Sequence, residues 1–182
     1  MHASARIVLL AARIKLAIFD VDGVLTDGRL MLGPNGQEFK NFHVRDGQGL
    51  VMLRESGVML AIITGRESAV VAERMAELGI EYVFQGQSDK LAALESLLRE
   101  LKVEATEVCY VGDDCPDIPV MTRVGLPIAV ADAHWMLHEH AVCTTTANGG
   151  AGAVREVCEL ILSAQDNLDG LASHGHRPTA DD

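Results

Sequence analysis

The sequence predicts an α/β domain with a doubly wound, Rossmann-like parallel sheet. Short apolar runs alternate along the chain with segments whose apolar residues recur at helical spacing, and this alternation is typical of right-handed βαβ units. The apolar runs are continuous, which favours strands that are covered on both faces. We expect strands at residues 16–19, 58–63, 82–84, 108–111 and 128–130.

The segments between these strands have the apolar spacing of helices. Leucines recur on one helical face between residues 91 and 101, and apolar residues do so between residues 154 and 161. A further helix is expected at about residues 47–56. Helices of this kind would cover the two faces of the sheet.

Residues 28–44 break the alternation and predict a small β-hairpin. Gly-Pro-Asn-Gly at 33–36 separates two extended runs, and such a turn is typical of a hairpin. Phe39 and Phe42 would point to opposite faces of a regular strand. Because a hairpin this small has no core of its own, apolar side chains on both faces indicate a contact with another subunit.

Length and charge limit the number of domains and the kinds of partner. A chain of 182 residues favours one domain, which we place at residues 1–170, and the polar residues 171–182 are expected to form a mobile tail. Asp and Glu outnumber Lys and Arg by 26 to 15, a formal charge of −11. This balance argues against a nucleic-acid or anionic-membrane binder, because it offers no basic surface.

The apolar runs are too short for a membrane protein. The longest have six residues, whereas a bilayer span needs roughly 20. One such run follows Arg6 and ends at Arg13, so it is shorter than a signal peptide requires. We therefore expect a cytoplasmic location.

The cysteines and histidines give no strong signal of a metal centre. Four cysteines lack the CxxC spacing of metal or disulfide motifs, so we interpret them as buried or partly buried free thiols. His138 and His140 are expected at the surface. No metal cluster is predicted around them and His134, because the nearby sequence offers no evident carboxylate partner.

Polar side chains follow three of the predicted strands, where ligands bind in an open parallel sheet. Clustered carboxylates raise one another's pKa unless a cation is present, so these aspartates predict Mg²⁺. A lysine and a hydroxyl aimed at the same point suit a phosphate dianion. The residues are Asp20 and Asp22 after the first strand, Thr64, Gly65 and Arg66 after the second, Asp113, Asp114 and Asp117 after the fourth, and Lys90 at a helix start.

The order of these motifs resembles the haloacid dehalogenase superfamily of phosphohydrolases. Asp20-x-Asp22-Gly comes first, Thr64-Gly follows 44 residues later, Lys90 comes 26 residues after that, and Gly-Asp-Asp-x-x-Asp occupies 112–117. The resemblance implies a Rossmann-like domain in which an aspartate attacks the phosphate and Mg²⁺ is the cofactor.

The resemblance also implies a role for each residue. Asp20 would be the nucleophile and Asp22 the general acid and base. Mg²⁺ would bind the Asp20 carboxylate, the Asp22 carbonyl and Asp113. Phosphoryl oxygens would be held by Thr64 and the Gly23 backbone, with Lys90 neutralising charge. Asp114 and Asp117 would not contact the phosphate; they would hold Lys90 and the metal ligands in position.

The spacing leaves no room for a large cap domain. Only 44 residues separate Asp20 from Thr64, and the hairpin and one helix occupy most of them. Since such sites exclude water by closure, we expect a neighbouring subunit to supply the lid. The small β-hairpin is the predicted contact.

Further segments resemble the 3-deoxy-D-manno-octulosonate 8-phosphate (KDO 8-phosphate) phosphatase family. They are residues 20–28, 43–49, 82–87, 130–134 and 149–156. The resemblance implies a homotetramer that hydrolyses KDO 8-phosphate for lipopolysaccharide synthesis. Relatives that act on nine-carbon sugar acid 9-phosphates carry an acidic residue after Thr-Gly, where this sequence has Arg66. Substrate-binding candidates are Gly23, Arg45, Gly65, Arg66, His134 and Arg155, since arginines suit the substrate's carboxylate.

Two alternatives stay open. One is a phosphatase of a nine-carbon 2-keto-3-deoxy sugar acid 9-phosphate, which differs in what contacts the longer chain. The other is a catalytically silent module of the same fold that serves oligomerisation. The silent module predicts loss of the nucleophile or the acid, whereas Asp20, Asp22, Lys90 and Asp113 are all present.

Overall fold

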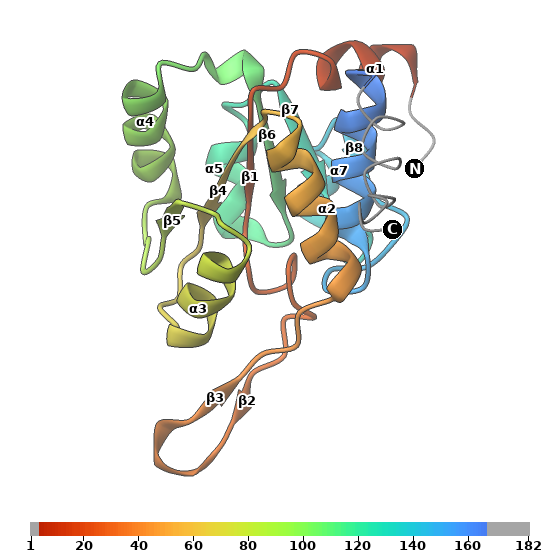
Figure 1. Cartoon of the computed structure of the whole chain (residues 1–182). Helices are drawn as coiled ribbons and strands as arrows, with labels where there is room; N and C mark the ends of the chain where they lie inside the picture. The colour runs from red at the N-terminus through yellow and green to blue at the C-terminus, as the bar shows by residue number, and fades with distance from the viewer. Residues whose placement is uncertain (1–3, 167–182) are drawn as a thin grey trace, which may run out of the picture.

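The computed structural model describes residues 4–166 and confirms the doubly wound α/β fold (Figure 1). Six parallel strands form one sheet in the order β5-β4-β1-β6-β7-β8, and helices cover both of its faces. The expected mobile tail at residues 171–182 lies outside the described residues. The strands are β1 Leu16–Phe19, β4 Met59–Ile63, β5 Tyr82–Phe84, β6 Val108–Gly112, β7 Leu126–Ala129 and β8 Cys143–Thr144.

Alternate residues of each central strand pack into different cores. Ala17 and Phe19 of β1 belong to one apolar cluster, which includes residues of α2, α3 and α7. Leu16 and Ile18 belong to a second cluster, which includes residues of α4 and α5. Because both faces are buried, the strand sequences are continuously apolar. The helices are α1 Ala5–Ala11, α2 Val44–Glu55, α3 Ala69–Glu77, α4 Lys90–Leu101, α5 Ile118–Met121, α6 Trp135–His138 and α7 Ala153–Ala164.

Some predicted boundaries were wrong. The helix expected from about residue 47 is α2, and it begins at Val44. Its start was obscured by Gly47 and Gly49, which disfavour a helix by propensity. The small size of Gly49 allows α2 and α7 to pack closely, since a Cβ at this position would lie 3.2 Å from the Cα of Arg155 in α7. The expected strand at 128–130 is β7, which begins earlier, at Leu126.

Several elements were not predicted individually, among them α1, α3, α5, α6 and β8. Helix α1 occupies the N-terminal apolar run that we had considered only as a possible signal segment, and the Ser4 hydroxyl caps it by accepting from Ile7 N at 3.4 Å. Strand β8 has two residues, too few to show a pattern. Among the helices of residues 4–166, none combines the length and the apolar character that crossing a bilayer requires.

The predicted hairpin is present and extends away from the sheet (Figure 1). Strands β2 (Met31–Leu32) and β3 (Glu38–Phe39) pair antiparallel around a turn at Pro34–Gly36. Phe42, by contrast, packs against the main core. The apolar residues exposed on the hairpin, which we call the hairpin patch, are Leu30, Met31, Leu32 and Phe39.

Asp46 joins the first and last parts of the fold. The N-cap position of α2 is His43, so Asp46 does not cap this helix. Asp46 is buried in the first turn of α2, and its carboxylate accepts hydrogen bonds from Gly152 N at 3.2 Å and Arg155 N at 2.7 Å. It thereby satisfies backbone donors at the start of α7.

We expect Asp46→Ala to lower the free energy of unfolding by about 2–3 kcal/mol, because it leaves two N–H groups of α7 without their acceptor. Urea denaturation checks this value. Glu73→Ala, at an exposed position within α3, is the matched control and should change stability by less than about 0.5 kcal/mol. Equal stability of the two variants would contradict a structural role for Asp46.

Candidate active site

The residues predicted to carry chemistry meet at the carboxyl ends of β1, β4 and β6. They surround an open cavity of about 340 Å³. Its position at the strand ends is the one expected for an open parallel sheet. The lining residues are Asp20, Asp22, Gly28, Thr64, Gly65, Arg66, Lys90, Asp113, Asp114, Pro116 and Asp117.

A buried lysine lies between two carboxylates at the floor of this cavity. Lys90 Nζ is 2.7 Å from Asp20 Oδ2 and 2.7 Å from Asp117 Oδ1. Burial lowers the pKa of Lys90, but the two carboxylates outweigh this effect and the pKa is raised. Lys90 is therefore a fixed positive charge beside Asp20.

Asp117 is held by several donors and serves as a hub. Besides Lys90, its Oδ1 accepts from the Tyr110 hydroxyl at 2.6 Å. Its Oδ2 accepts from Asp113 N at 3.0 Å and from Asp114 N at 3.3 Å. Asp117 thus orients both the lysine and the loop that follows β6. Tyr110 was not predicted, since it reads in sequence as a residue of a buried strand.

Three carboxylates converge beside the lysine in a way that suits a divalent cation. One oxygen each of Asp20, Asp113 and Asp117 lies within 4.8 Å of the others. Burial, then the charge of Asp117, raises the pKa of Asp20 to about 6 despite the opposing effect of Lys90. Burial, then the charges of Asp20 and Asp117, raises the pKa of Asp113 to about 8. A hard cation would relieve this repulsion, so the donor set fits Mg²⁺.

Glycines allow the backbone to approach these groups closely. Gly23 has a φ of +90°, and a Cβ there would overlap the Asp113 carboxylate. Gly149 in turn lies against the Gly23 carbonyl. The turn after Asp22 therefore has room beside the carboxylates only because it lacks a side chain.

Asp22 belongs to an ionic network that includes residues of the hairpin. It pairs with Lys40 Nζ, and Arg66 Nε lies 3.5 Å from its Oδ2. Glu38 binds the same two cations, 2.8 Å from Arg66 Nη2 and 3.5 Å from Lys40 Nζ. The Lys40 side chain is only 1% exposed, so its charge is committed to these carboxylates.

Sequence reasoning missed Lys40 and Glu38. The alternation Glu38-Phe39-Lys40 puts two opposite charges on one face of the hairpin strand, opposite Phe39, and this pattern could have indicated a polar contact. We had instead weighed only the apolar residues of this segment. The hairpin is therefore attached to the site of its own chain through charged residues.

The remaining predicted residues fall into two groups. Thr64 and Gly65 line the cavity, with Thr64 buried, and Asp114 lines its rim while its Oδ1 accepts from Cys115 N at 2.7 Å. Within residues 4–166, Arg45 and Arg155 lie outside the cavity lining. Arg45 is an exposed residue of the first turn of α2.

Arg155 and His134 also have partners outside the cavity. Arg155 Nε pairs with Glu159 Oε1 at 2.6 Å along α7. His134 lies near the rim, and its backbone N–H donates to the Asp113 carbonyl at 2.7 Å. Neither side chain is among those that line the cavity of this chain.

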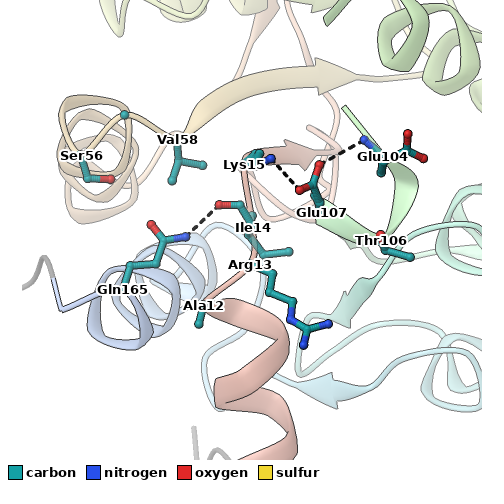
Figure 2. A pocket seen from close by; sticks show the side chains of 11 residues that line it. Ala12, Arg13, Ile14, Lys15, Ser56, Val58, Glu104, Thr106, Glu107 and Gln165 are labelled. Carbon is teal, nitrogen blue, oxygen red and sulfur yellow. Dashed lines mark hydrogen bonds and ion pairs between the residues drawn. The ribbon is translucent and has the colours of Figure 1, made fainter. Parts of the chain in front are cut away.

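A second cavity, of about 630 Å³, lies at the opposite edge of the sheet (Figure 2). Two of its charged side chains pair with each other: Lys15 Nζ lies 2.6 Å from Glu107 Oε1. Gln165 Nε2 donates to the Ile14 carbonyl at 2.8 Å. Although larger, this cavity lacks the converging carboxylates of the first, so the chemistry belongs to the carboxyl edge.

Comparison with known proteins defines the class to which this fold and site correspond. The profile of the haloacid dehalogenase-like hydrolases matches residues 80–157. The chain is 51% identical over 166 residues to the 3-deoxy-D-manno-octulosonate 8-phosphate phosphatase KdsC of Escherichia coli (strain K12), covering 91% of this chain and 88% of that protein.

Two solved structures are similar over almost the whole chain. A probable YrbI family phosphatase from Pseudomonas syringae pv. phaseolica is 52% identical, with a TM-score of 0.93, over 96% of this chain and 99% of its own. The KDO 8-phosphate phosphatase of Moraxella catarrhalis, in complex with magnesium, phosphate and KDO, is 45% identical, with a TM-score of 0.93, over 96% and 100%. The chain belongs to the KDO 8-phosphate phosphatase family of haloacid dehalogenase-like hydrolases.

We expect Lys40→Met to reduce hydrolysis of a phosphate monoester about 10- to 100-fold. The variant removes one of the two cations that Asp22 and Glu38 share, so the two carboxylates repel each other more strongly and Asp22 loses a contact that positions it. Steady-state kinetics checks this expectation. Lys15→Met, which removes an exposed lysine at the opposite edge of the sheet, is the matched control and should keep full activity. Full activity of Lys40→Met would show that the ionic network is dispensable.

Proposed function

We propose that this protein is a Mg²⁺-dependent phosphomonoesterase that hydrolyses KDO 8-phosphate to KDO and phosphate through an aspartyl-phosphate. The observation that carries the proposal is the Asp20 carboxylate, held at the end of β1 by Lys90 and flanked by Asp113 and Asp117. The substrate is taken from the family, whose members are named for it.

The cation would be held by Asp20, Asp113 and the Asp22 carbonyl, and when bound it supplies positive charge to the phosphate oxygens. In the first half-reaction, Asp20 forms a bond to phosphorus while the bond from phosphorus to the sugar oxygen breaks. Asp22 gives that oxygen its proton. In the second, water attacks phosphorus, Asp22 takes the water's proton, and Asp20 is released as a carboxylate.

The other residues of the cavity would bind the phosphate and hold Asp20 in place. Thr64 and the backbone of Gly23 and Gly65 offer donors to phosphoryl oxygens. Lys90 faces Asp20 with a charge that Asp117 keeps oriented. This lysine would offset the negative charge that accumulates when a dianion approaches a carboxylate.

Recognition of the sugar acid would fall to basic side chains at the mouth. Arg66 lines the cavity, and its side chain is 45% exposed, so it can exchange Glu38 for the substrate's carboxylate. Arg45, Arg155 and His134 lie outside the cavity of their own chain. We propose that they contribute at a site completed by a neighbouring subunit.

We also propose a homotetramer in which the hairpins close neighbouring sites. The support is the hairpin patch, in which Leu30, Met31, Leu32 and Phe39 are each more than half exposed. Exposed apolar side chains gathered on a two-stranded hairpin favour burial against another chain. The location we propose is the cytoplasm, where the product would enter lipopolysaccharide precursor synthesis; the four free thiols suit a reducing compartment.

The function is tested by phosphate release from KDO 8-phosphate, a nine-carbon sugar acid 9-phosphate and simple sugar phosphates, with Mg²⁺ and with EDTA. We expect Mg²⁺-dependent turnover that favours KDO 8-phosphate, and a loss of at least about 100-fold in Asp20→Asn, which lacks the nucleophilic charge. Asp166→Asn is the matched control. Preference for the nine-carbon acid would replace the substrate assignment, and no turnover at all would favour the silent module.

The tetramer is tested by light scattering coupled to size exclusion. We expect Phe39→Ser to dissociate the tetramer, since the variant removes about 2 kcal/mol or more of apolar burial in each copy of the contact. Leu9→Ser, which removes an equally exposed apolar residue from α1, should leave the mass unchanged. A monomeric wild-type protein would overturn this part of the proposal.

A further inference from the structure

A second group of metal-ligating side chains lies beside the loop that follows β6, and its two sulfur atoms have no part in the proposed reaction. It consists of Cys115, which lies in the loop after β6, and His134 and Met136, which lie around the start of α6. The two segments are held together by the hydrogen bond from His134 N to the Asp113 carbonyl, 2.7 Å long. The sequence places these residues about twenty positions apart, so only the fold brings them together.

Two of our expectations were wrong at this point. We had interpreted all four cysteines as buried or partly buried, but Cys115 is exposed. We had also found no carboxylate near His134. In the structure, one oxygen of Asp114 lies within 4.8 Å of both the Cys115 sulfur and a His134 ring nitrogen. A thiol, an imidazole and a carboxylate therefore meet at one accessible point.

The distances among these groups suit a tetrahedral ion. Cys115 Sγ lies 3.6 Å from His134 Nδ1 and 3.8 Å from Met136 Sδ. Zinc bonds of about 2.3 Å to sulfur and about 2.0 Å to nitrogen, at tetrahedral angles, separate sulfur from nitrogen by about 3.5 Å and two sulfurs by about 3.8 Å. The two separations measured from the Cys115 sulfur are close to two edges of such a tetrahedron.

The ring nitrogen that faces the thiol is His134 Nδ1, and Met136 N lies 3.4 Å from it as a backbone donor. The tautomer that accepts this hydrogen bond has a lone pair at Nδ1. This is the form in which histidine binds metals. A metal would replace the weak hydrogen bond at Nδ1 and the proton of the Cys115 thiol, which leaves to solvent.

We propose that Asp114, Cys115, His134 and Met136 form a binding site for a zinc-group divalent cation, distinct from the carboxylate site for Mg²⁺. Thiolate, thioether and imidazole ligands select Zn²⁺ or Cd²⁺, whereas Mg²⁺ takes oxygen ligands. The two sites adjoin through the chain, because Asp113 directly precedes Asp114. An ion at the second site would fix the loop that carries Asp113 and so slow the reaction. This slowing rests on the proposed function, but the binding does not.

Cadmium binding in the presence of excess Mg²⁺ tests the site independently of activity. We expect the thiolate-to-cadmium charge-transfer band in the ultraviolet to grow and saturate at one ion per chain. Cys115→Ser should abolish the band, and Met136→Leu should weaken the affinity at least about tenfold. Cys143→Ser, which removes a partly buried thiol on β8, is the matched control and should keep the band.

The opposite pattern would overturn the proposal. A band that survives in Cys115→Ser, or that disappears in Cys143→Ser, assigns cadmium to another thiol. The absence of a band in the wild-type protein shows that there is no thiolate site at all. Inhibition is followed separately: Zn²⁺ should slow wild-type phosphate release in excess Mg²⁺ and have at least about tenfold less effect on Cys115→Ser, whose activity without Zn²⁺ should be unchanged.

Discussion

The buried contact of Lys90 with Asp20 and Asp117 is the constraint on which the rest of the structure depends. Removing three charges from water is costly unless they are close together, and here each carboxylate oxygen lies 2.7 Å from the ammonium nitrogen. The three residues belong to the end of β1, the start of α4 and the loop after β6. Satisfying this contact therefore fixes the positions of three separate parts of the chain relative to one another.

The main features of the fold and site could be predicted because they depend on local sequence. A strand buried on both faces must be continuously apolar, as 16–19 and 108–111 are, and the residue after it is placed at the sheet edge by strand geometry alone. Asp20 and Asp113 could be assigned to one edge for this reason. Lys90 followed from its place at a helix start, which the structure has at the same residue.

Other features depend on contacts between distant segments, which a single sequence does not contain. Lys40 reaches Asp22 across 18 positions, and Cys115 reaches His134 across 19. Asp46 resembles an ordinary helix-capping residue until α7, over 100 positions later, supplies the donors that it binds. The same holds for Gly49, which disfavours a helix by propensity. Its lack of a side chain is needed because α7 passes close to it, and a single sequence does not show that contact.

The position of β1 has a consequence for how the protein is made. This strand is the first to be synthesised, yet it lies at the centre of the sheet, between β4 and β6. One of these neighbours, β6, is synthesised about ninety residues after β1. Helix α7, which packs against Ala17 and Phe19 of β1, is synthesised later still. A growing chain must therefore carry an apolar strand with an unpaired edge until β6 has been synthesised.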